Sequence, residues 1–185
     1  MRELSLNVMD IAQNSLVAGA SLITIIVCED DASLTITIED NGKGMDAETL
    51  ERVQSPFYTT RTTRSVGLGI PLYKMACEMT GGSLELSSEL GVGTKLKALF
   101  FKKHIDMVPL GDISQTVQLL VTCNPDVDFV YTRTLCNCSY TMDTREMREI
   151  LGEDVPLSSP DVSLWLKEYL AEQDAELKHR MYDMI

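Results

Sequence analysis

Hydrophobic positions along the chain predict alternating helices and strands. Between residues 3 and 18, apolar side chains recur every three to four positions, which is the spacing of one helical face. Residues 21–29 and 33–39 are rich in β-branched side chains, and the second run alternates apolar with polar residues. These two runs therefore predict a β-hairpin, and Gly19 ends the helix before it.

The alternation continues after this hairpin. A short helix is predicted over 46–53, whereas residues 54–66 have little periodicity and are expected to form a mobile loop. Helical spacing returns over 68–80 and ends at a glycine pair. The apolar residues expected on one side of that helix are Leu72, Met75, Ala76 and Met79. Two strands, 83–88 and 94–101, follow, so we expect an α+β fold with helices layered on a mixed, mostly antiparallel sheet.

The pattern changes near residue 105. The elements expected beyond it are a helix over 112–122, strands near 129–131 and 139–142, a short helix over 143–151, and a long charged helix over 160–184. We therefore expect two parts, residues 1–104 and a small α/β region over 105–185. The last helix places four apolar residues close together, Trp165, Leu166, Tyr169 and Leu170. They predict either a docking or homodimer face or packing against the chain's own first part.

Composition narrows the class of protein. The chain has 185 residues, 44% of them hydrophobic, which is enough for a real core. A formal net charge of −12 argues against a nucleic-acid partner held by phosphate neutralisation. No apolar run approaches the ~20 residues that span a bilayer, so we expect a cytoplasmic protein with no membrane partner. The five cysteines are an odd number and the sequence shows no secretory signal, so a disulfide framework is not expected. Cys136 and Cys138 are expected in a half-buried hairpin rather than a metal site.

The first predicted helix carries a polar stripe of Asn7, Asp10 and Asn14. Asp10 and Asn14 are four residues apart, so their side chains lie one above the other and can reach a common ligand. An amide oxygen beside a carboxylate suits Mg²⁺, with Asn14 as its direct ligand and Asp10 as a general base on a water molecule. The alternative is an ordinary solvated helix face.

Two glycine-containing segments are candidates for binding a ligand. Asp40 ends a predicted strand and is followed by Gly42 and Gly44, which let the backbone approach a ligand closely. An ionised Asp40 only accepts hydrogen bonds, which suits an amino group such as that of adenine. Gly67 and Gly69 open a helix whose free amides favour phosphate binding. The alternatives are an ordinary strand-end turn after Asp40 and a solvated loop before Gly67. Neither segment matches the P-loop or Rossmann pattern.

Taken in order, these motifs resemble those of the GHKL superfamily, which contains gyrase, Hsp-type chaperones, histidine kinases and mismatch-repair ATPases. Residues 10–16 resemble its N-box helix, and residues 40–45 its DxGxG box. Residues 55–60 are similar to the histidine kinase F-box, and residues 66–70 to the second glycine box. The resemblance covers roughly residues 3–103. It implies a Bergerat-type two-layer sandwich that binds ATP and Mg²⁺, with a small appendage after it.

The resemblance also implies roles for particular residues. Asn14 would hold magnesium, and Asp40 would accept a hydrogen bond from the adenine amino group. Thr94 would support the Asp40 end of the site. Gly67 and Gly69 would bring amides to the phosphates beneath a lid over about 57–66. The full nucleotide-binding set that it implies is Asn14, Asp40, Gly42, Gly44, Met45, Thr60, Arg61, Gly67, Leu68, Gly69 and Thr94.

The chain also departs from the family pattern. Hydrolytic members carry Glu where Asp10 stands, and sensor kinases place Lys and Tyr where this chain has Val17 and Ala18. The N-box begins almost at Met1, so a preceding phosphoacceptor domain and autophosphorylation in cis are not expected. We expect an ATPase or a protein kinase acting in trans on a regulatory or effector protein. The alternative is a nucleotide-sensing interaction module that does not hydrolyse ATP.

Overall fold

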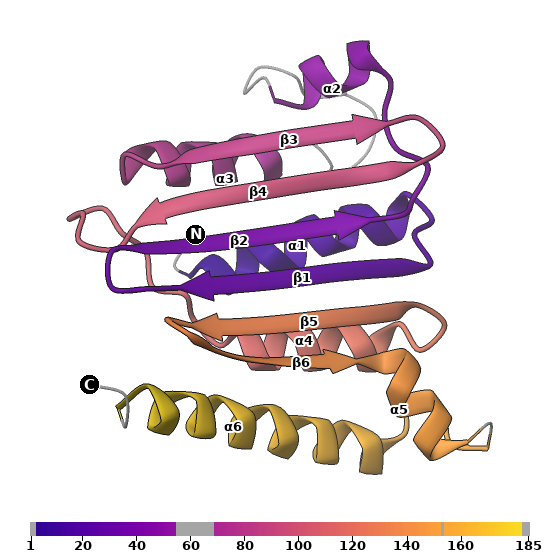
Figure 1. The fold of residues 1–185 in the computed structure, drawn as a ribbon. Helices are drawn as coiled ribbons and strands as arrows, with labels where there is room; N and C mark the ends of the chain where they lie inside the picture. The colour runs from indigo at the N-terminus through magenta and orange to yellow at the C-terminus, as the bar shows by residue number, and fades with distance from the viewer. Residues whose placement is uncertain (1–2, 55–68, 153, 183–185) are drawn as a thin grey trace.

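A six-stranded sheet with helices packed on one face organises the molecule (Figure 1). The computed structural model describes residues 3–54, 69–152 and 154–182. The strands are β1 (Leu22–Glu29), β2 (Ser33–Asp40), β3 (Ser83–Glu89), β4 (Gly93–Phe101), β5 (Asp128–Leu135) and β6 (Cys138–Asp143). The helices are α1 (Leu4–Val17), α2 (Ala47–Val53), α3 (Gly69–Met79), α4 (Ile113–Cys123), α5 (Thr144–Leu151) and α6 (Pro160–Tyr182).

The strand order is β3-β4-β2-β1-β5-β6. Only β1 and β5 run parallel, and the other four neighbouring pairs are antiparallel, so the sheet is mixed and mostly antiparallel. The predicted α+β fold class is confirmed. The two C-terminal strands extend the same sheet rather than forming a second one, because β5 lies along the whole of β1. The division near residue 104 stays a prediction.

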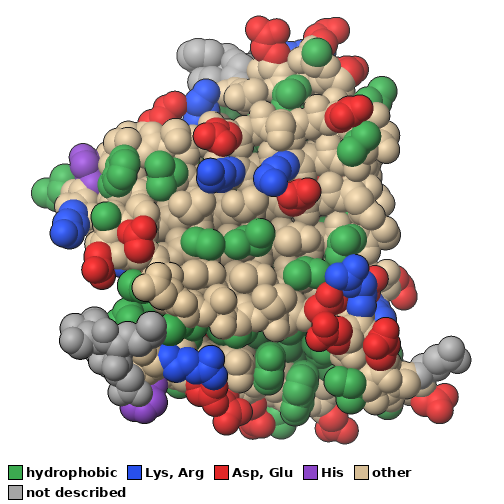
Figure 2. All heavy atoms as spheres, viewed as in Figure 1, with side chains coloured by type: hydrophobic (Ala, Val, Ile, Leu, Met, Phe, Trp, Pro, Cys, Tyr) green, Lys and Arg blue, Asp and Glu red, His purple; other side chains and the backbone are tan. Residues whose placement is uncertain are grey.

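Strand alternation separates a buried face of the sheet from an open one. In β1 and β2 every second residue is almost fully buried beneath the helices, as Ile25 and Ile36 are. The other face carries the intervening residues. Figure 2 looks onto it and shows acidic and basic side chains side by side; one such pair is Lys95 with Glu39, 3.0 Å apart. Helices α1, α3 and α4 therefore pack on the same face of the sheet (Figure 1).

Helix α1 packs against the sheet with the face that the sequence predicts. The residues of that face are all buried: Leu4, Val8, Ile11, Ala12 and Ser15. Asp10 and Asn14 are exposed, but Asn7, which we expected beside them, is only 3% exposed. The reason is helical geometry, because Asn7 stands three residues after Leu4 and four before Ile11 and so falls at the edge of the buried face.

Helix α3 is apolar on more than one side. Its predicted apolar side is largely exposed, with Leu72 at 41%, Met75 at 53% and Met79 at 50%. Tyr73 and Cys77, four residues apart, instead face the core, and the Tyr73 ring lies 5.6 Å from that of Phe100 on β4. Hydrophobic spacing alone does not say which of two apolar sides is buried.

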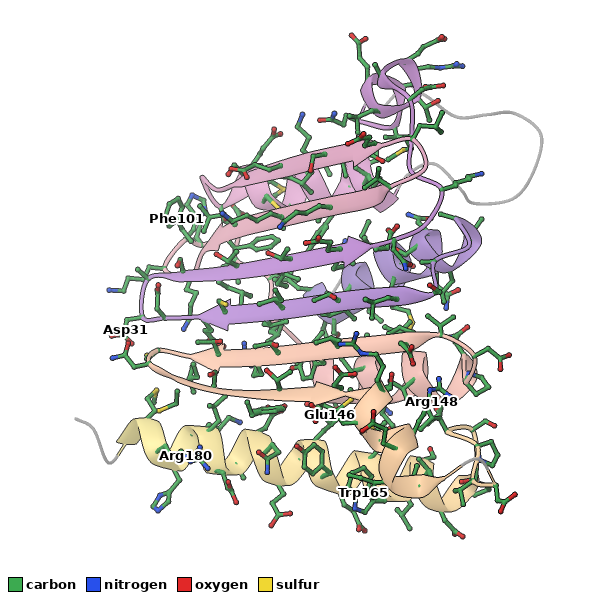
Figure 3. The ribbon with its side chains drawn as sticks, turned by 45° about the vertical axis from the view of Figure 1, so that its right-hand side comes forward. Asp31, Phe101, Glu146, Arg148, Trp165 and Arg180 are labelled. Carbon is green, nitrogen blue, oxygen red and sulfur yellow. The ribbon has the colours of Figure 1, made fainter. Side chains whose placement is uncertain are left out.

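The last helix, α6, divides its apolar residues between core and surface. Leu166 and Leu170 are fully buried, so this helix packs against the chain's own sheet and α4. Trp165 is 49% exposed and stacks on Tyr169 with ring centroids 5.1 Å apart (Figure 3). Packing against the chain itself is thus present, and a docking face at Trp165 stays a prediction. Among the described residues, no helix is both long and apolar enough to cross a bilayer.

The β5–β6 hairpin holds Cys136 and Cys138 at its turn. Cys136 adopts a left-handed backbone with φ 53°, and its amide donates to the Glu29 carbonyl over 2.7 Å. Neither cysteine forms a disulfide, and both are half-buried, as the sequence predicts for a hairpin position. Within the ranges that the structure describes, no group of three or more metal-ligating side chains comes together.

Candidate functional site

The carboxylate of Asp40 is held at the end of β2 by two hydrogen bonds. Ser15 of α1 donates to Oδ2 over 2.5 Å, and the amide of Gly42 donates to Oδ1 over 2.9 Å. Strand alternation turns Asp40 toward the helix-covered face, like the buried Ile38 two residues earlier. The carboxylate is therefore fixed before any ligand is present, with accepting capacity left on both oxygens.

The turn after Asp40 depends on its glycines. Gly44 has φ +64°, and a Cβ placed there would lie 1.9 Å from the backbone oxygen of Glu89. A Cβ on Gly42 would lie 3.0 Å from both Ala18 Cβ and Asp40 Oδ1. Gly44 therefore fits this path only without a side chain, and a side chain on Gly42 would make its neighbours shift. The close approach of these glycines to a ligand stays a prediction.

The polar stripe of α1 faces the beginning of α3. A Cβ on Gly69, the first residue of α3, would lie 3.9 Å from Asp10 Cβ and 4.0 Å from Asn14 Nδ2. The first amides of a helix lack partners within the helix and attract negative charge. Asp10, Asn14 and the start of α3 therefore share one space, although they are more than fifty residues apart in sequence.

Strand β4 completes the strand-end part of the site. Thr94 is the residue paired with Asp40 across the β2–β4 ladder. Its hydroxyl lies 2.9 Å from that of Ser88, which also accepts from the amide of Met45 over 2.8 Å. Met45 and Thr94, both in the predicted nucleotide-binding set, are thus linked through one serine.

Four members of that set lie outside the described residues: Thr60, Arg61, Gly67 and Leu68. Their roles stay predictions. The same holds for the loop and lid expected between residues 54 and 66, of which only Gln54 is described.

Sequence reasoning missed three residues that build the site. They are Ser15, Ser88 and Asn41. Asn41 accepts from the amides of both Ser21 and Leu22 over 2.9 Å, which ties the end of β2 to the start of β1. A serine on the apolar face of a helix was the available signal, because a buried hydroxyl needs a partner.

A hollow of about 470 Å³ opens at the same end of the sheet. Its walls include Glu39, Ser87 and Lys95, which strand alternation puts on the open face. Asp40 also lines the hollow, but its side chain points to Ser15 on the helix-covered face. The hollow therefore adjoins the site through the sheet and is not the space shared by Asp40, Asn14 and Gly69.

Comparison with known families agrees with this arrangement. Residues 1–104 match the model of the histidine kinase-, DNA gyrase B-, and HSP90-like ATPases. The chain belongs to this family. Its members bind ATP in a domain of this kind, so the predicted resemblance is confirmed, and the matched residues contain α1, the Asp40 turn and Thr94.

Among similar curated proteins are several bacterial sensor kinases. The sensor kinase CckA of Brucella abortus is 29% identical over 148 residues, which cover 68% of this chain and 16% of that protein. Sporulation kinase A of Bacillus subtilis is 30% identical over 103 residues, which cover 56% of this chain and 17% of the kinase. This chain thus spans less than a fifth of either relative.

A solved structure supports the fold independently. The N-terminal domain of a DNA repair protein superimposes with a TM-score of 0.56 at 16% identity, covering 83% of this chain and 58% of that one. At this identity the likeness shows a shared fold. It extends beyond the 104 residues of the family match.

Proposed function

We propose that this chain binds Mg-ATP between α1, the Asp40 turn and the start of α3. The observation that carries the proposal is the fixed carboxylate of Asp40, held by Ser15 and the Gly42 amide. Such an acceptor suits the exocyclic amino group of adenine. The family match supports nucleotide binding at this position.

The remaining roles follow the geometry. The amide oxygen of Asn14 is a hard donor suited to Mg²⁺, and the ion would bridge protein and phosphate oxygens. The amides at the start of α3 would lie against the phosphates, since Gly69 packs beside Asn14. Asp10 stands one turn before Asn14 on the same exposed stripe, where it can orient a water molecule.

We further propose that bound ATP supports ATPase or protein kinase activity in trans, on a regulatory or effector protein. Similarity to sensor kinases favours such activity over nucleotide binding without turnover. The second candidate is a nucleotide-sensing module without turnover. It is favoured by Asp10, whose carboxylate is one methylene shorter than the Glu of hydrolytic members and reaches less far from α1.

Calorimetric titration of ATP in the presence of magnesium tests the binding proposal. We expect wild type to bind, Asp40→Asn to lose affinity strongly, and Asn14→Ala to lose mainly the magnesium-dependent part. Asp31→Asn is the matched control, because Asp31 is exposed at the far end of the β1–β2 hairpin (Figure 3). Binding that is unchanged in Asp40→Asn would contradict the proposal.

Phosphate release and label transfer then separate the two candidates. Release or transfer that is lost in Asp10→Ala supports turnover with Asp10 as the base. Turnover that persists in Asp10→Ala contradicts that role. Binding without any release or transfer favours the sensing module.

A further inference from the structure

A second hollow lies at the opposite end of the sheet from Asp40. Its volume is about 370 Å³, and it is enclosed by the ends of β1 and β5, the start of α4 and the second half of α6. The polar residues around it are Glu29, Asp112, Ser114, Arg133, Asp174 and Lys178. Its walls come largely from residues beyond 104, outside the family match.

Two cations share the carboxylate of Glu29 at this hollow. The carboxylate of Glu29 contacts two cations, Lys102 at 2.8 Å and Arg133 at shorter range. Burial alone would raise the pKa of Glu29, but the contacts with Lys102 and Arg133 outweigh it and lower that pKa. Glu29 is thus ionised near neutral pH, and its single negative charge faces two positive ones.

Arg133 has a terminal nitrogen that nothing in the described structure satisfies. Only 8% of the residue is exposed, and its Nη2 donates to Glu29. Its Nη1 is shielded from solvent and has no hydrogen-bond partner. A buried donor left without an acceptor typically costs about 1–3 kcal/mol, and more when it is charged. An acceptor that reached Nη1 from the hollow would remove this cost.

The neighbouring carboxylates do not supply that acceptor. Asp174 accepts from the hydroxyls of Ser114 over 2.6 Å and Tyr140 over 2.8 Å. Asp112 caps α4 by accepting from the amide of Gln115 over 2.8 Å. Both are therefore engaged with other donors. The start of the 11-residue helix α4 also borders this space, and Asp112 already caps it.

We propose that this hollow binds the oxyanion group of a small molecule, a carboxylate or a phosphate, through Arg133. Lys178 is exposed at the rim and adds a second positive charge along the approach. The space of about 370 Å³ admits a small metabolite beyond the oxyanion itself. The site is independent of the proposed ATP site, since the two lie at opposite ends of β1.

Titration by two-dimensional amide NMR on the full chain tests the proposal. The probes are sodium phosphate and sodium acetate, each against sodium chloride at equal ionic strength. We expect saturable shifts at Gly111, Ser114 and Arg133 with at least one probe, and the stronger probe identifies the oxyanion. Arg133→Lys keeps a cation for Glu29 but has no second terminal nitrogen, so affinity falls roughly tenfold or more, as loss of a charge-assisted hydrogen bond implies.

Two further variants keep the test decisive even if Arg133→Lys does not fold. Lys178→Ala changes only an exposed side chain, and we expect it to weaken probe binding about two- to fivefold, as for an exposed charge pair. Arg180→Ala, on the same helix, is the control with unchanged binding, because Arg180 pairs with Glu176 and does not line the hollow (Figure 3).

Three results would overturn the proposal. One is the absence of saturable shifts with both probes. Another is a set of shifts confined to the Gly42–Gly44 turn, which would place the anion in the nucleotide site. The third is equal affinity in wild type, Arg133→Lys and Lys178→Ala. That result would mean that Arg133 Nη1 donates to a buried water molecule rather than to the oxyanion.

Discussion

Replacing Ser15 with alanine tests whether Asp40 must be fixed before nucleotide arrives. Ser15 is 4% exposed and donates over 2.5 Å to Asp40 Oδ2, so the substitution removes one hydrogen bond to a charged group and little volume. Such bonds contribute about 1.5–3 kcal/mol. In the free protein Asp40 is only partly buried, and water can replace the lost donor. In the complex the nucleotide would exclude that water, so loss of the hydrogen bond should lower the affinity for ATP more than the stability of the free protein.

We therefore expect the dissociation constant for ATP to rise about tenfold in Ser15→Ala, corresponding to about 1.4 kcal/mol. The assay is calorimetric titration with magnesium, accompanied by urea unfolding of the free protein. Ser87→Ala is the control, because Ser87 is exposed at the same end of the sheet but on its open face. An affinity unchanged from wild type, or a loss of folding stability as large as the loss of binding, would falsify the reasoning.

Three further predictions can be tested by urea unfolding, two of them with a matched control substitution. Gly44→Ala should cost more than 2 kcal/mol, because φ is +64° and the new Cβ meets Glu89 O; Gly19→Ala, at φ +76° with nothing within 4 Å, should cost only about 1 kcal/mol. Leu170→Ala should lower the free energy of unfolding by about 2–5 kcal/mol, since Leu170 is fully buried. Leu164→Ala should lower it by under about 0.5 kcal/mol, because Leu164 is exposed. Equal losses would contradict the packing of α6 against the core. The lowered pKa of Glu29 adds stability near neutral pH that is lost on acidification through that pKa, so Glu29→Gln should flatten the acid limb of stability against pH.

Local periodicity was sufficient to predict the first half of the fold. The helix over 3–18, the hairpin strands and the position of Asp40 all follow from patterns that burial against one sheet imposes on nearby residues. The turn after Asp40 was predictable for a different local reason, because Gly42 and Gly44 mark positions where the chain is closely approached by its neighbours. The α3 helix shows the limit, because either of its apolar sides satisfies the same local pattern.

Contacts between distant segments were not predictable from spacing. The parallel pairing of β1 with β5 joins Leu22 to Asp128, and nothing in either strand specifies the other as its neighbour. The bond from Ser15 to Asp40 similarly joins a helix and a strand that each have a complete local explanation. The hollow around Arg133 depends on four elements at once, so no short motif marks it.

The placement of the candidate nucleotide site follows from the same patterns that form the core. Burial of Val8, Ile11 and Ala12 leaves α1 one orientation on the sheet, and that orientation turns Asp10 and Asn14 toward the start of α3. The alternation that buries Ile38 turns Asp40 to the same side two residues later. The position of Asp10 is thus fixed by packing, and its reach is set by its own length. If Asp10 has the proposed role, Asp10→Glu, which adds one methylene group without altering the core, should raise the rate of phosphate release; an unchanged rate would argue that the reach of Asp10 does not limit turnover.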